Sequence, residues 1–203
     1  MERAAGPVSM HPCALMPHSY SFLGQMPPVA TRPFRGAKDT LRLMADLALG
    51  ERGERSIHVR RFTEWVVRDI WPKDYLGEIL AIRNILVQPS PSRPGTPLFR
   101  YVNDPRHVEY VKDPQRMVEE IMAFGTTAVD CDEQALMCAT MAMQLGRRPQ
   151  YVALGFSPNQ LTHVACRVQE PKTNEWIWMD SVAGPREREA SEKAKTILTW
   201  DLD

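Results

Sequence analysis

The chain has 203 residues, and its 25 Lys plus Arg balance 25 Asp plus Glu, so the formal net charge is zero. This length allows one domain with a sizeable core and terminal extensions. The balanced charge excludes the strongly basic character typical of proteins that bind nucleic acid or anionic membranes, so we expect neither partner. No apolar run approaches the roughly 20 residues that cross a bilayer, which predicts a soluble protein.

Residues 1–36 carry six prolines and no helical or strand period, which predicts an extended N-terminal arm. We expect this arm to dock onto a partner or a larger assembly. Its apolar residues are too interrupted for a secretory signal, and four cysteines without such a signal are typical of thiols in a reducing compartment. The chain is therefore predicted to be cytoplasmic, or virion-associated if a phage encodes it.

Helical spacing of apolar residues predicts three helices, over residues 38–49, from residue 57 to before Pro72, and from residue 75 to Leu86. Ser56 and Asp74 are suited to capping the second and third. Residues 88–98 contain four prolines and are predicted to form a loop. A short extended piece over residues 99–103 follows, and then Asp113-Pro114 opens a helix that ends before Gly125.

The sequence Asp130-Cys131-Asp132-Glu133 matches a capping box, so Cys131 is predicted in the first turn of a helix that ends at Gly146. Three strand-like runs follow, over residues 150–156, 161–168 and 175–180, and their short turns favour an antiparallel meander. Helices followed by such a sheet indicate an α+β fold. Residues 184–203 are predicted to be a charged C-terminal tail.

Three residues of this plan suggest nucleophilic catalysis. A helix N-terminus favours the thiolate of Cys131 and offers backbone N–H groups to an oxyanion. Strand alternation puts His163 on the face opposite the apolar set Val164, Cys166 and Val168, where it can meet the thiol. If the second and third strands pair, Asp180 can bond the other ring nitrogen of His163 and fix its tautomer.

These residues resemble the transglutaminase-like core of the papain-like superfamily over residues 99–183. The likeness is carried by Asp130-Cys131-Asp132-Glu133, Leu145-Gly146, His163-Val164 and Trp178-Met179-Asp180. Upstream, residues 72–77 and 101–105 look like stand-alone bacterial and phage members. The resemblance departs from the family at Val129, where Gly is common, and at Ala165, where an aromatic residue often follows the histidine.

The resemblance implies a papain-like catalytic domain over residues 37–183, with Cys131, His163 and Asp180 as a catalytic triad. It implies amide hydrolysis or acyl transfer through a thioester, with a peptide or protein amide as substrate and with no cofactor or metal. Residues 99–103 are expected to supply a second oxyanion donor, either a backbone N–H or the Asn103 side chain.

Other interpretations of these residues predict different chemistry. Zinc is disfavoured, because His163 and Cys166 point to opposite strand faces, and Cys131 and Cys138 lie about 10 Å apart along a helix whereas zinc–sulfur bonds span about 2.3 Å. Capping explains Asp132 and Glu133 without catalysis. The alternative function is a structural or assembly component, for example of a phage virion, that keeps the fold and docks through its arm.

Overall fold

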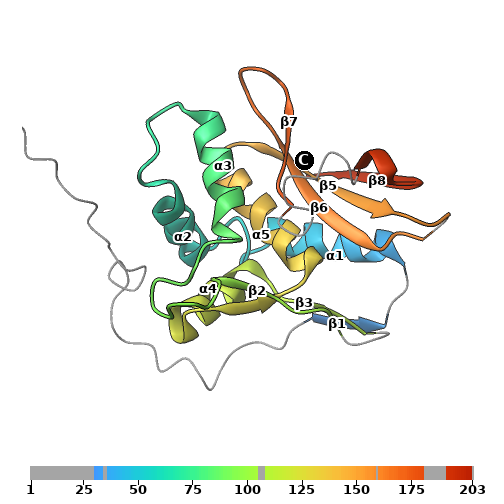
Figure 1. The fold of residues 1–203 in the computed structure, drawn as a ribbon, viewed down its shortest axis with the longest axis horizontal. Helices are drawn as coiled ribbons and strands as arrows, with labels where there is room; N and C mark the ends of the chain where they lie inside the picture. Colours follow the sequence, from blue (N-terminus) through green and yellow to red (C-terminus); the bar gives the residue numbers. More distant parts are fainter. Residues whose placement is uncertain (1–29, 34–35, 105–107, 159, 181–190, 203) are drawn as a thin grey trace, which may run out of the picture.

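The computed structural model describes residues 30–33, 36–104, 108–158, 160–180 and 191–202. Helices and a four-stranded antiparallel sheet make a mixed α+β structure (Figure 1), as predicted. In chain order the elements are β1 (Ala30–Pro33), α1 (Ala37–Leu49), α2 (Ile57–Val67), α3 (Tyr75–Ile85), β2 (Phe99–Tyr101), β3 (Val108–Val111), α4 (Pro114–Phe124), β4 (Thr127–Val129), α5 (Cys131–Gln144), β5 (Arg148–Gly155), β6 (His163–Gln169), β7 (Trp176–Trp178) and β8 (Thr196–Asp201).

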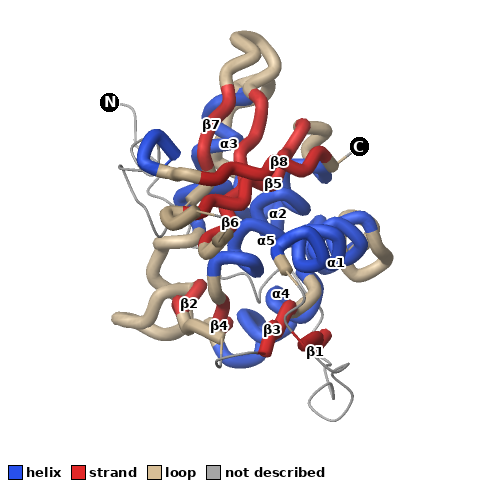
Figure 2. The backbone as a smooth tube through the Cα atoms, turned by 90° about the vertical axis from the view of Figure 1, so that its right-hand side faces the viewer, coloured by secondary structure: helices blue, strands red, loops and turns tan. Residues whose placement is uncertain are grey.

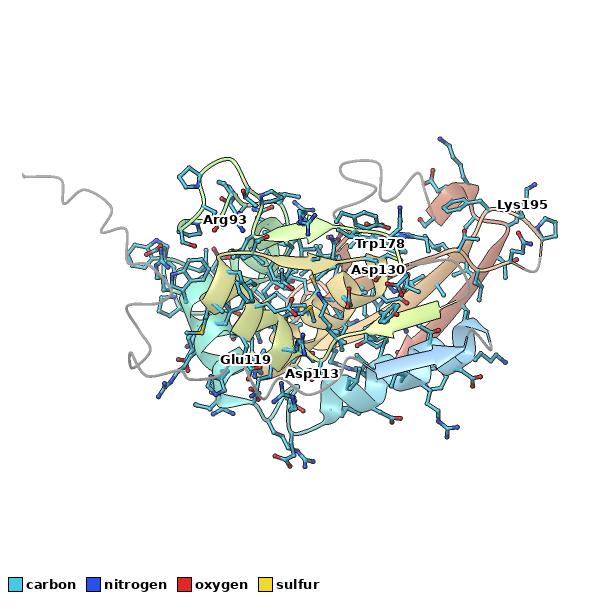
Figure 3. The ribbon with its side chains drawn as sticks, turned by 90° about the horizontal axis from the view of Figure 1, so that it is seen from below. Arg93, Asp113, Glu119, Asp130, Trp178 and Lys195 are labelled. Atoms are coloured by element: carbon cyan, nitrogen blue, oxygen red, sulfur yellow. The ribbon has the colours of Figure 1, made fainter. Side chains whose placement is uncertain are left out.

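The predicted helix caps are confirmed. The side chains of Ser56, Asp74 and Asp113 each accept a hydrogen bond from a backbone N–H three residues on, at the starts of α2, α3 and α4. Asp113 also pairs with Arg52 at 3.0 Å, and Arg52 contacts Glu119 at 3.3 Å, so the guanidinium ties the loop after α1 to α4. Asp113 and Glu119 are labelled in Figure 3. α2 ends at Val67, earlier than predicted, and turns lead on to Pro72.

α5 is the central helix of the fold. Every residue from 132 to 142 is buried, because the helix packs on β5 and β6 on one side and on α1, α2, α3 and α4 elsewhere. Figure 2 shows it between the large sheet and α4. A helix surrounded on all sides holds its N-terminal residue, Cys131, in a fixed position relative to the sheet.

The large sheet has the strand order β7-β6-β5-β8, and all its neighbouring strands are antiparallel. The predicted meander of β5, β6 and β7 is confirmed, and so is the burial of Val164, Cys166 and Val168. β8 is a difference, because its residues were predicted to belong to a charged tail. Most charged side chains of that segment precede Thr196, and the strand itself is a Thr-Ile-Leu-Thr-Trp-Asp run, rich in residues suited to a sheet edge.

Two smaller pairs complete the fold. β1 pairs with β3, so the end of the predicted arm is a strand, whereas residues 1–29 and the predicted docking of the arm lie outside the described residues. β2 pairs in parallel with β4, and the register sets Tyr101 opposite Val129, two residues before Cys131. Among the described residues, no helix has both the length and the apolar character needed to span a membrane.

Candidate active site

Cys131 is the first residue of α5, and a complete capping box surrounds it. The Asp130 carboxylate accepts the backbone N–H groups of Asp132 at 3.0 Å and of Glu133 at 3.4 Å. Glu133 in turn accepts the N–H of Asp130 at 3.0 Å and that of Lys112 at 3.1 Å. Burial, together with the nearby charge of Asp130, raises the pKa of Glu133 to about 7. The backbone that presents the thiol is therefore held by hydrogen bonds on both sides.

His163 and Asp180 come together as the strand pattern predicts. His163 begins β6, Asp180 follows the end of β7, and the antiparallel register aligns the two strands with Arg167 opposite Trp178. The Nε2 atom of His163 lies 2.6 Å from Oδ2 of Asp180, and Asp180 is only 6% exposed. A bond at Nε2 leaves Nδ1 as the ring nitrogen that can exchange a proton with another group.

The thiol and the imidazole line one cavity of about 280 Å³. The backbone N–H of Val164, the residue after His163, donates a hydrogen bond to the Cys131 sulfur. This bond ties the start of α5 to the start of β6. Figure 3 labels Asp130, the residue before α5, and Trp178 on β7, the strand that pairs with β6. The lining residues are Ala37, Thr40, Tyr101, Asn103, Asp104, Asp130, Cys131, Asp132, Leu161, Thr162, His163 and Val164.

The expectation of a thiolate at the helix N-terminus is wrong for the protein as it stands. Burial, and then the charges of Asp132 and Asp130, raise the pKa of Cys131 well above its ordinary value. The thiol donates a hydrogen bond to Oδ1 of Asp132 at 3.5 Å. A helix N-terminus supplies about half a positive charge, which two full carboxylate charges and the loss of water outweigh.

The Tyr101 side chain is part of the site, although the sequence predicts only a backbone N–H of residues 99–103 or the Asn103 side chain there. It lines the cavity, and burial, with the nearby Cys131 and Asp130, raises the pKa of its phenol to about 12. The phenol is therefore a protonated hydrogen-bond donor beside the thiol at neutral pH. Its position depends on the pairing of two three-residue strands, for which the local sequence gives no signal. Asn103 also lines the cavity, and its role in an oxyanion hole stays a prediction.

Other thiols and acids have simpler explanations. Cys138 and Cys166 are 0% exposed and lie in the core, whereas Cys13 lies outside the described residues. Ligand atoms of Asp130, Cys131 and Asp132 lie within 4.8 Å of one another, which is close enough for a metal ion. Helix capping and the bond to the thiol account for both carboxylates, so the cluster by itself assigns no metal.

Comparison with protein-family models, with curated proteins and with solved structures finds no match to this chain. The geometry of the cavity is therefore the physical basis on which a function can be proposed. Three features matter most: a cysteine at a helix start, a histidine at a strand start and a carboxylate bonded to that histidine.

Proposed function

We propose that this protein is a cysteine-dependent amide hydrolase or acyltransferase of the transglutaminase-like, papain-like type. The observation that carries the proposal is the bond of 2.6 Å between His163 and Asp180, at a cavity that the Cys131 thiol also lines. A nucleophile, a base and a group that orients the base are the parts that covalent acyl transfer needs. A cysteine helix followed by an antiparallel sheet with His and Asp supports the papain-like fold.

In the first half-reaction, the Cys131 sulfur attacks the carbonyl carbon of a peptide or protein amide in the cavity. Nδ1 of His163 takes the thiol proton, and Asp180 stabilises the imidazolium through its bond to Nε2. The tetrahedral intermediate then collapses: the C–N bond breaks, the proton on Nδ1 passes to the leaving amine, and a thioester to Cys131 remains.

In the second half-reaction, water or an amine attacks the thioester, and Nδ1 of His163 takes a proton from the attacking group. When the C–S bond breaks, that proton returns to the sulfur of Cys131. Water yields a carboxylic acid and an amine yields a new amide, so hydrolysis and acyl transfer use the same residues. A cavity of about 280 Å³ has room for one side chain of an acyl donor.

The negative charge on the attacked oxygen needs donors that are already in place. The backbone N–H of Cys131, in the first turn of α5, is one such donor, since the first N–H groups of a helix have no intrahelical acceptor. The Tyr101 hydroxyl and the Asn103 amide line the same cavity and are the side-chain donors we propose as the second. Tyr101→Phe and Asn103→Ala separate their contributions.

One observation favours the alternative of a structural or assembly component. The raised pKa of Cys131 means that its thiol is protonated near neutral pH, as expected of a chemically idle cysteine. A protonated thiol still reacts when a base removes its proton during the attack, in the way that serine hydrolases activate a hydroxyl. The two functions therefore differ in whether His163 changes the reactivity of the thiol.

Hydroxylamine capture tests the proposal without a known substrate. The protein is incubated with a peptide digest and hydroxylamine, which converts an acyl-enzyme to a hydroxamate that is measured by mass spectrometry. We expect hydroxamates with the native chain and none with Cys131→Ala or His163→Ala. Equal yields from Cys131→Ala would contradict the proposal, and a folded native chain that forms none from digests of several proteomes would favour the structural alternative.

A further inference from the structure

Asp132, the residue after the proposed nucleophile, has a role in the cavity that helix capping does not explain. Its Oδ1 atom is 3.5 Å from the Cys131 sulfur and accepts the thiol hydrogen. The Val164 N–H donates a hydrogen bond to the same sulfur. The Cys131 sulfur thus accepts one hydrogen bond, from Val164, and donates one, to the Asp132 carboxylate.

The Asp132 carboxylate is fixed in place. It is 5% exposed, and the capping bond to its N–H holds its backbone. On the core side, the Tyr151 hydroxyl is fully buried, has no hydrogen-bond partner within the described part of the chain, and is close enough to Asp132 for the carboxylate to raise the pKa of the phenol. Bulk water therefore screens little of the Asp132 charge at the sulfur.

The other groups that face the thiol do not offset this charge. Asp130 is the N-cap residue of α5 and Asp132 lies in its first turn, Tyr101 and Asp104 come from β2 and the residues after it, and His163 comes from β6. Among the described lining residues there is no Lys or Arg. His163 is then the one lining side chain that can become a cation, and Asp180 lies behind it.

We propose that Asp132 is a positioning residue that keeps the proton on the Cys131 thiol of the resting protein, so that the nucleophile stays latent until His163 takes the proton during attack. This inference rests on the proposed function for its purpose, although the contact it describes exists without it. Since the thiolate is the form that alkylating agents and oxidants attack, a latent thiol also resists modification between turnovers.

Alkylation by iodoacetamide at a series of pH values measures the contact directly. The sulfur loses its proton to buffer, displaces iodide and forms a thioether, and mass spectrometry of the peptide that carries Cys131 follows the reaction. Asp132→Asn removes the charge and keeps the shape of the side chain. Asp130→Asn is the matched control, because it removes the charge of the neighbouring capping residue and leaves a good cap.

For Asp132→Asn we expect the alkylation midpoint to fall by at least about one pH unit. Below the midpoint, each unit raises the thiolate fraction tenfold and lowers its intrinsic reactivity about threefold, so the rate rises about three- to fourfold. Asp130→Asn should give a smaller shift. An Asp132→Asn midpoint equal to that of the native chain, or a shift no larger than that of Asp130→Asn, overturns the proposal.

Two controls keep the outcome interpretable. Circular dichroism and the midpoint of the urea-unfolded chain, expected at about 8.5, show whether a variant has merely unfolded, and Asp132→Ser replaces Asp132→Asn in that event. Failure of the proposed function looks different. In that case Cys131→Ala and His163→Ala do not change hydroxamate yield, while the shift caused by Asp132→Asn remains.

Discussion

Cys131 and Cys166 are two thiols whose pKa values are both raised by burial, yet they lie in different surroundings. Cys166 is 0% exposed on the core face of β6, and its polar contacts are backbone groups of Gln150 and Arg167. Cys131 lines a cavity, where it donates a hydrogen bond to the Asp132 carboxylate, and His163 lines the same cavity. Burial favours the protonated thiol at both positions, whereas the polar side chains around Cys131, Asp132 among them, distinguish a site from a core.

The largest difference between the two thiols is expected when each sulfur is removed in turn. Cys131→Ala should abolish hydroxamate formation and change the free energy of unfolding by less than about 0.5 kcal/mol, since alanine suits the first turn of a helix. Cys166→Ala should keep the activity and cost about 1–2 kcal/mol, because it leaves a cavity in a packed core. Urea unfolding and the capture assay measure both, and a reversed pattern would contradict the assignment.

The next largest effect is expected from the acid that orients the base. Asp180→Asn should lower kcat/KM for hydroxamate formation about 10²- to 10⁴-fold, mostly in kcat, because the His163 ring loses its fixed tautomer. Asp201→Asn is the control, since Asp201 accepts a bond of 2.6 Å from Gln150 on the same sheet but lies on β8. A loss of activity no greater than that of the control would remove Asp180 from the mechanism.

A smaller effect, on stability, is expected from Glu133, the glutamate of the α5 capping box. The folded chain raises the pKa of Glu133 from 4.5 to about 7, against the opposing attraction of Lys112. The folded state therefore binds the proton more tightly, and the stability this adds is full below pH 4.5 and is lost as the pH rises to 7, about 3 kcal/mol in all.

Glu133→Gln should lack that pH dependence, because an amide does not titrate. We expect the stability of the native chain relative to Glu133→Gln to decline between pH 4.5 and 7, measured by urea unfolding at each pH. The slope of the free energy of unfolding against pH is compared between the two chains. Loss of a hydrogen bond from the backbone N–H of Lys112 or Asp130 would shift all free energies of the variant by a constant and leave that slope unchanged. Parallel curves for the two chains would show that Glu133 does not titrate in this range.

The smallest effect is expected at the hydroxyl behind Asp132. Tyr151→Phe removes a buried hydroxyl without a partner in the described residues, so the free energy of unfolding should stay within about 1 kcal/mol of the native value or rise. Thr63→Val is the contrast, because the Thr63 hydroxyl donates a hydrogen bond to the Gln144 amide oxygen at 2.7 Å, and valine removes that donor. A larger loss from Tyr151→Phe than from Thr63→Val would mean that the phenol has a bound partner such as water.

Local signals predicted much of this fold. The caps at Ser56, Asp74 and Asp113, and the box of Asp130 with Glu133, each depend on residues three or four positions apart, so the sequence alone contains them. The pairing of His163 with Asp180 followed from strand alternation and one short turn, which is also a local pattern.

What could not be predicted depends on contacts between distant segments. The pairing of β8 with β5 and of β2 with β4 joins residues far apart in the chain. Because β2 carries Tyr101, the place of the Tyr101 side chain at the cavity could not be predicted. The protonation state of the Cys131 thiol could not be predicted for a similar reason. Position on a helix suggests a thiolate, whereas the depth of burial and the direction of the Asp132 side chain decide the balance of charge.

The most direct measurement is to locate the acyl group itself. After incubation with a peptide digest and rapid quenching in acid, tryptic mass mapping should show a thioester on the peptide that carries Cys131, and treatment with hydroxylamine should remove it. His163→Ala should leave that peptide unmodified. An acyl group on the peptides of Cys13, Cys138 or Cys166, or the same adduct on Cys131 without the imidazole, would contradict this account.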